Sequence, residues 1–212
     1  AMGLVNLADE YERLCNRDFS AELEDDALSR RKRVQIEDAM VAVELSSTDE
    51  NKARAAASVS FRHLALLAQV KPTDEGVWQS LQSSGALETP GEELVDRLSR
   101  MRSWIASDHF PEEMRINLSQ EPNKNALNLL SVEQMRVVKV LHSVLSQVSW
   151  DVEGITAAFK EASVQANVGM RDVYRASYAV FMGAERGPRL APILSNCERE
   201  EMLTLVKKSA AL

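Results

Sequence analysis

The sequence is poor in cysteine and has no long apolar run. Only two cysteines, Cys15 and Cys197, occur in its 212 residues, and their wide separation matches neither a metal-binding spacing nor a disulfide framework. So few cysteines are typical of a reducing compartment, and we expect a cytoplasmic protein. No apolar stretch approaches the roughly 18 residues that a membrane span requires, so the sequence predicts no membrane partner.

The motifs of the common catalytic sites are absent as well. The sequence contains no glycine-rich phosphate loop, no His-Glu-x-x-His, no Gly-x-Ser-x-Gly and no Cys-x-x-Cys. Its histidines, His63, His109 and His142, are scattered. The many carboxylates are distributed as on solvated helix faces, which gives no reason to select a catalytic pair. We therefore predict no catalytic residue, no metal site and no cofactor in this chain.

Aromatic residues make up only 5% of the chain, and helix-forming residues dominate the rest. This composition predicts a mostly α-helical fold. The formal net charge of −7 argues against a general nucleic-acid binder, because sequence-independent affinity comes from Lys and Arg that neutralise phosphates. Residues 169–212, however, carry seven Lys or Arg against five acidic residues. Such a distribution suits a protein that contacts an anion locally.

Hydrophobic periodicity divides the chain into two parts. For residues 1–48 we expect a connecting segment of mixed structure. It contains a solvated linker over 16–33 and a stretch (41–45) in which a short strand competes with a helix. Residues 49–212 show helical periods outside the segment 108–130 and predict a helical bundle or cage. The segment 108–130, rich in Pro and Asn, is the candidate boundary between two helical subdomains.

Several residues have the pattern of helix caps. Thr89, followed by Pro90 and Glu92, predicts a helix start with a capping box, and Ser131 with Gln134 predicts another. Ser149 is the expected N-cap of the next helix. Gly183 has the position of a helix-ending glycine.

Aromatic and basic residues gather around that last glycine. Tyr174 and Arg175 precede it on one helix, and Arg186 and Arg189 flank the Gly-Pro turn that follows. Aromatic faces beside guanidinium groups are typical of single-stranded RNA recognition. The alternative is that the tyrosines are core residues and the arginines pair with nearby acids, and the residues alone leave both interpretations open.

The C-terminal run "VYRASYAVFMGAERGPRLAPILSNCEREEMLTLV" resembles the end of class I lysyl-tRNA synthetases, and "SFRHLALLAQV" and "LADEYERL" resemble further blocks of that family in the same order. The resemblance implies the family's C-terminal half, an α-helical cage that binds the anticodon of the lysine tRNA. ATP-dependent activation of lysine would then belong to an N-terminal domain whose HIGH and KMSKS signatures are absent here. The chain alone is therefore not expected to be catalytic.

The resemblance also selects candidate residues. The motif members in the turn region are Gly183, Gly187, Pro188 and Arg189, of which the glycines and the proline are expected to shape the turn. The exposed RNA-binding candidates are Arg62, Tyr174, Arg175, Arg186 and Arg189, with Trp104 and Trp150 as further stacking platforms.

Some features depart from the family. Leu190-Ala191-Pro192 stands where the family more often has a second glycine. The anticodon-binding cage of glutamyl-tRNA synthetases and a helical protein-interaction module are the alternative interpretations.

Overall fold

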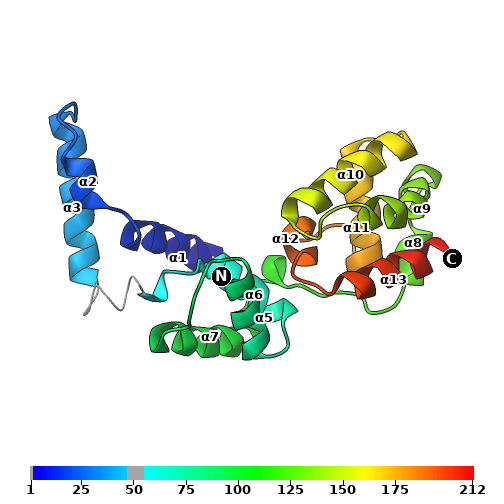
Figure 1. The fold of residues 1–212 in the computed structure, drawn as a ribbon, viewed down its shortest axis with the longest axis horizontal. Helices are drawn as coiled ribbons and strands as arrows, with labels where there is room; N and C mark the ends of the chain where they lie inside the picture. The colour runs from blue at the N-terminus through cyan, green and yellow to red at the C-terminus, as the bar shows by residue number, and fades with distance from the viewer. Residues whose placement is uncertain (1, 47–54) are drawn as a thin grey trace. The chain divides into compact units, whose positions relative to one another are not determined.

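A computed structural model describes residues 2–46 and 55–212 (Figure 1). All regular structure in these ranges is helical, which confirms the predicted mostly α-helical fold. The chain divides into two compact units, Ala1–Pro111 and Glu112–Leu212.

The first unit contains two groups of helices. Its helices are α1 (Met2–Cys15), α2 (Phe19–Leu23), α3 (Arg30–Ser46), α5 (Phe61–Val70), α6 (Asp74–Ser83) and α7 (Glu92–Ile105). A small core joins α1, α2 and α3 through Cys15, Phe19, Ile36 and Val43. Buried leucines of α5 and α7, such as Leu67 and Leu98, form the interior of the other group.

Residues 2–46 are more helical than expected. The predicted linker contains α2 and the start of α3, and the choice left open between strand and helix for 41–45 is decided in favour of a helix. The physical reason lies in the period of burial: Ile36 and Val43, seven residues apart, are buried, whereas Val41 and Leu45 are exposed. Two turns of a helix separate such positions, so burial follows the helical period and not the alternation of a strand. Arg33 then donates a hydrogen bond to the carbonyl of Leu23 (3.2 Å), which ties α3 to α2.

The helix starts of α6 and α7 depend on different groups. Thr73 caps α6, since its hydroxyl accepts a hydrogen bond from the amide of Gly76 (3.1 Å). The capping box expected at Thr89 and Glu92 is absent: α7 begins at Glu92, and its N-cap is Gly91. Gly91 has an extended backbone and gives no side-chain cap. The helix therefore begins later than the threonine pattern predicts.

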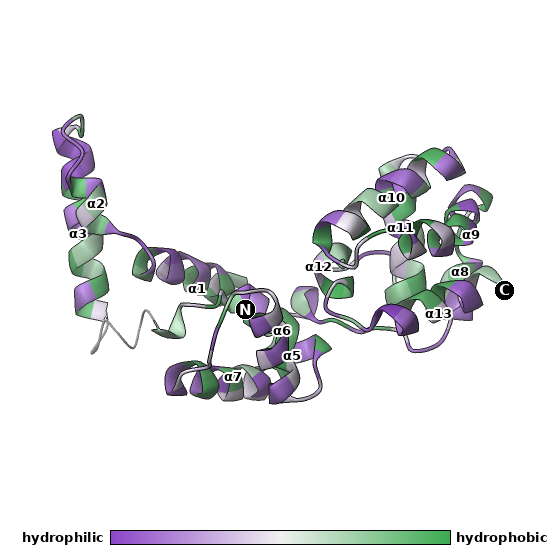
Figure 2. Ribbon diagram, viewed as in Figure 1, coloured by the Kyte–Doolittle hydropathy of each residue, from purple (hydrophilic) through white to green (hydrophobic). Residues whose placement is uncertain are grey.

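The second unit is a helical bundle around one continuous core. Its elements are η1 (Glu112–Met114), α8 (Lys124–Asn128), α9 (Val132–Ser146), α10 (Val152–Ala166), α11 (Met170–Met182), α12 (Leu190–Leu194) and α13 (Arg199–Ala210). Figure 2 shows polar and apolar residues alternating along α9, α10 and α13, the pattern of helices that bury one side only. Buried Leu141, Phe159 and Val180 belong to this core.

The caps of this unit largely follow the sequence. Ser131 and Gln134 form the predicted capping box at the start of α9. The N-cap of α10, however, is Asp151 and not Ser149, because the Asp151 carboxylate accepts a hydrogen bond from the amide of Gly154 (2.7 Å). Helix α11 ends at Gly183, as predicted.

Candidate nucleic-acid interface

Helix α11 presents a mixed aromatic and basic surface. Its inward face is buried through residues such as Val173 and Val180. Tyr174, by contrast, is 36% exposed, and its ring meets the ring of Phe159 edge-on at 5.7 Å between centroids. One side of the Tyr174 ring is therefore anchored to the core, while the rest of the ring remains accessible.

Gly183 fixes the direction in which the chain leaves α11. It has a left-handed backbone with φ of 60°, a conformation that favours glycine. A Cβ atom at this position would lie 2.4 Å from Nδ2 of Asn123, which no side chain could tolerate without a shift. The amide of Ser119 also donates to the carbonyl of Phe181 (2.8 Å). The segment before α8 is thus held against the end of α11.

The Gly-Pro turn folds back onto α11. The hydroxyl of Tyr178 donates to the carbonyl oxygens of Gly187 and Pro188, both at 2.9 Å. Gly187 passes close to α11, since a Cβ there would lie 2.9 Å from Sδ of Met182. Burial of the hydroxyl raises the pKa of Tyr178, and the nearby Tyr174 raises this pKa further. Tyr178 therefore positions the turn, and Gly187 and Pro188 have contacts that fit their expected role in shaping it.

Of the four arginines of this region, Arg175 alone has a partner among the residues that the structure describes. Arg175 pairs with Glu185 (2.8 Å), as in the alternative interpretation from the sequence. The side chains of Arg186 and Arg189 are exposed and have no hydrogen bond or ion pair to the residues that the structure describes; the same holds for Arg171. Asp172 forms an ion pair with none of them within the described residues; it accepts a hydrogen bond from Gln134 (2.8 Å).

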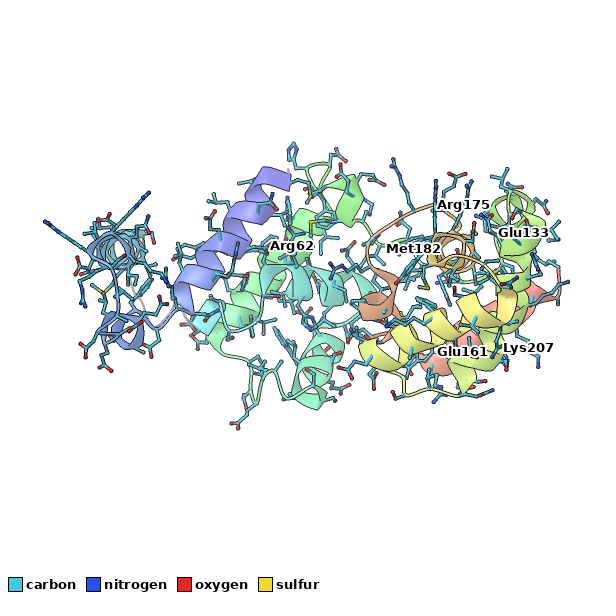
Figure 3. All side chains as sticks on the ribbon, turned by 90° about the horizontal axis from the view of Figure 1, so that it is seen from above. Arg62, Glu133, Glu161, Arg175, Met182 and Lys207 are labelled. Atoms are coloured by element: carbon cyan, nitrogen blue, oxygen red, sulfur yellow. The ribbon has the colours of Figure 1, made fainter. Side chains whose placement is uncertain are left out.

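A pocket of about 250 Å³ lies between two segments of the second unit. One is α8 with its flanking residues, and the other is the C-terminal half of α11 with residues 183–185. Arg175 and Glu185 belong to its lining (Figure 3 labels Arg175 on α11). Asn123 and Asn125 line it from the other side. These asparagines were not among the predicted site residues. The available sequence signal was an asparagine before a short helix, because Asn123 caps α8.

Arg62 and Trp104 belong to the first unit. Arg62 on α5 contacts α1, where it pairs with Asp9 and donates to Oδ1 of Asn6 (2.9 Å); its position is labelled in Figure 3. The Trp104 ring packs between Phe61 and Phe110, at 5.5 and 4.8 Å between centroids. Both side chains therefore have partners within their own unit.

Trp150 lies in the second unit, where it is half-buried at the start of α10. Its indole nitrogen donates to the carbonyl of Cys197 (3.0 Å), and the guanidinium of Arg199 lies 5.9 Å from its ring. These contacts connect the segment before α10 to the start of α13. Tyr174 and Arg175 thus lie on α11 and Arg186 and Arg189 on the turn that follows it, whereas Trp150 has other neighbours.

No group of three or more potential metal ligands occurs in residues 2–46 and 55–212. Within the same ranges, no helix combines the length and apolar character that crossing a membrane demands.

No family model matches the chain. Curated relatives do match it, and they are lysine–tRNA ligases of archaea. The chain is 23% identical over 206 residues to the lysine–tRNA ligase of Thermoplasma volcanium, with 97% of the chain and 37% of the relative covered. For that of Thermococcus kodakarensis the identity is 26% over 208 residues, with 94% and 37% covered. For that of Methanopyrus kandleri it is 26% over 219 residues, with 97% and 37% covered.

These matches confirm the resemblance to lysyl-tRNA synthetases. The chain spans little more than a third of the length of these relatives, while almost all of the chain is matched. This coverage agrees with similarity to the C-terminal half of a class I lysyl-tRNA synthetase.

Proposed function

We propose that this chain is the anticodon-binding portion of a lysine–tRNA ligase and recognises the anticodon of the lysine tRNA in the cytoplasm. The proposal assigns ATP-dependent attachment of lysine to parts of the enzyme outside this chain, so ATP and lysine would be bound there. One observation carries it: Arg186 and Arg189 are exposed and unpaired within the described residues, on a turn that Tyr178 holds against α11.

The geometry suits an RNA loop. Tyr174 offers an accessible ring whose position is fixed by Phe159. A base that stacks on this ring would therefore lose little side-chain entropy on binding. Arg186 and Arg189 keep their N–H groups for phosphates or base edges. Because the Gly-Pro turn is hydrogen-bonded to α11, its two arginines leave the surface from a defined backbone.

The charge of the chain supports selective binding. With a formal net charge of −7, the protein as a whole repels RNA. Binding then depends on a few local contacts, and a few contacts give a shallow dependence on salt. The similarity to lysine–tRNA ligases supports tRNA as the nucleic acid.

The test compares a stem-loop with the lysine anticodon and a stem-loop with a scrambled anticodon, titrated with the 212-residue chain at several salt concentrations. We expect tighter binding of the lysine anticodon. The variant Arg189→Ala should weaken it and should reduce the slope of log affinity against log salt by about 0.7, the value for one phosphate contact on a single strand.

The matched control is Arg100→Ala, which removes an exposed arginine of α7 that pairs with Asp96 (2.8 Å). This variant should bind like the unmodified chain. Equal and feeble binding of both stem-loops by the unmodified chain would overturn the proposal and favour a helical protein-interaction module.

A further inference from the structure

The pocket between α8 and α11 has a volume that suits one small ring. Its volume of about 250 Å³ lies just below the roughly 300–1,000 Å³ of pockets that hold drug-sized ligands. Its apolar lining comes from Ala126, Leu129 and Leu130 on one side and Ala179 on the other. Leu129 is 70% exposed, so an apolar surface is available to the face of an entering ring.

Polar groups surround this apolar surface. The side-chain oxygen of Asn123 accepts a hydrogen bond from the amide of Ala126 (3.1 Å), which fixes the side chain and directs its nitrogen toward Gly183. The amide of Asn125 has no partner among the described residues. Asn123 and Asn125 therefore bring free amide hydrogens to the lining.

Arg175 and Glu185 add charge to the same lining. Arg175 uses one terminal nitrogen for Glu185 (2.8 Å), and its other N–H groups have no partner within the described ranges. Glu185 still has a second carboxylate oxygen that can accept a hydrogen bond. The pocket thus combines amide and guanidinium donors with a carboxylate acceptor around an apolar centre.

We propose that this pocket holds a single unstacked base of the RNA loop, an inference that rests on the proposed function. A base has apolar faces and an edge that carries both donors and acceptors, which matches the mixture of groups here. The position supports this occupant. Glu185 lines the pocket, and the next residue, Arg186, is exposed and unpaired within the described residues. A nucleotide with its base in the pocket would therefore place its backbone near a free guanidinium group.

The experiment combines changes in the RNA with changes in the pocket. Each loop nucleotide of the lysine-anticodon stem-loop is made abasic in turn, and the affinity of the 212-residue chain is measured for each RNA. If one base occupies the pocket, one abasic position should weaken binding by roughly fivefold or more, the equivalent of about one hydrogen bond. The variants Asn125→Ala and Leu129→Ala should weaken binding of the intact loop and should reduce the penalty at that position.

Two control variants match these changes outside the pocket. Asn128→Ala removes an exposed asparagine of α8 that does not line the pocket, and Val164→Ala removes an apolar side chain of α10 that is 73% exposed. Both should retain the full abasic penalty. All four positions are exposed, so folding should be retained, and circular dichroism of each variant checks this.

The result separates this inference from the proposed function. If the chain prefers the lysine anticodon and every variant shows the same abasic penalties, the pocket proposal is overturned while the proposed function stands. If the chain binds no stem-loop, the proposed function fails. The pocket is then judged by titrating the isotope-labelled chain with nucleoside monophosphates: shifts of the side-chain amide resonances of Asn123 and Asn125 support a base site, and unchanged resonances overturn it.

Discussion

Arg97 on α7 and Glu12 on α1 form an ion pair although 85 residues separate them. Both side chains are largely buried, with exposed fractions of 18% and 9%. The second carboxylate oxygen of Glu12 accepts a hydrogen bond from the amide of Phe61 (2.8 Å). Arg97 also donates to the carbonyl of Val59 (2.8 Å). The pair therefore joins α1, the start of α5 and α7 within the first unit.

The first prediction is that Arg97→Ala destabilises the first unit strongly. The change would leave the Glu12 carboxylate buried without its cation, and such a loss typically costs about 3–5 kcal/mol. Urea unfolding followed by tryptophan fluorescence and by circular dichroism measures the free energy of unfolding. Arg100→Ala on the same helix removes an exposed pair and should cost less than about 1 kcal/mol. Equal costs for the two variants would contradict a structural role of the Glu12 pair.

A second prediction concerns the two glycines with positive φ, Gly183 and Gly85, which have φ of 60° and 71°. Gly85→Ala meets no atom within 4 Å, so its cost should be the left-handed strain alone, roughly 1–2 kcal/mol. Gly183→Ala adds the clash with Asn123 at 2.4 Å and should cost more. Thermal unfolding of both variants provides the comparison. A smaller shift for Gly183→Ala would mean that the segment around Asn123 is displaced easily.

The third prediction separates the roles of two tyrosines on α11. Tyr178→Phe removes the hydrogen bonds to Gly187 and Pro188, so it should cost about 1 kcal/mol of stability and weaken RNA binding without changing its salt dependence. Tyr174→Phe keeps the ring and should bind RNA as before, whereas Tyr174→Leu should lose roughly 1–3 kcal/mol of stacking energy. Titration of the lysine-anticodon stem-loop measures the RNA affinity of all three variants. Unaltered binding by Tyr174→Leu would exclude the ring from the interface.

The fourth prediction is a pH dependence caused by His63. Burial lowers the pKa of His63 below its ordinary value of 6.5. A histidine whose pKa is depressed by folding binds a proton more readily when unfolded, so its contribution to stability is present above pH 6.5 and is lost as the pH falls through the folded pKa. His63→Leu should reduce the loss of stability between pH 7 and pH 5. Urea midpoints across this range check it, and parallel curves for the two chains would refute the assignment.

Much of the helical structure could be predicted from local sequence. The capping box at Ser131 and the left-handed end of α11 at Gly183 follow from residues within one turn of the chain. Local sequence was insufficient where two signals competed. The pattern of 41–45 left strand and helix open, and the N-cap of α7 is Gly91 and not the predicted Thr89. Tertiary packing decides such cases, because it selects which face is buried.

The candidate site was predicted in part. The residues around Gly183 were identified from the sequence because aromatic and basic residues lie close together along the chain. Asn123 and Asn125 were missed, because they lie in a segment without a clear period. Trp104 and Trp150 were selected by residue type alone, and their packing contacts depend on partners far away in sequence, such as Phe61 and Cys197.

The sequence by itself determined the helical class of this protein and its similarity to lysyl-tRNA synthetases, since periodicity, caps and motif order are all written along the chain. Only the tertiary structure decided which groups are free and which are used. Arg175 is paired with Glu185, while Arg186 and Arg189 are unpaired within the described residues. The physical reason is that an ion pair or a hydrogen bond depends on distances of a few ångströms, which packing sets between residues and which no local pattern encodes.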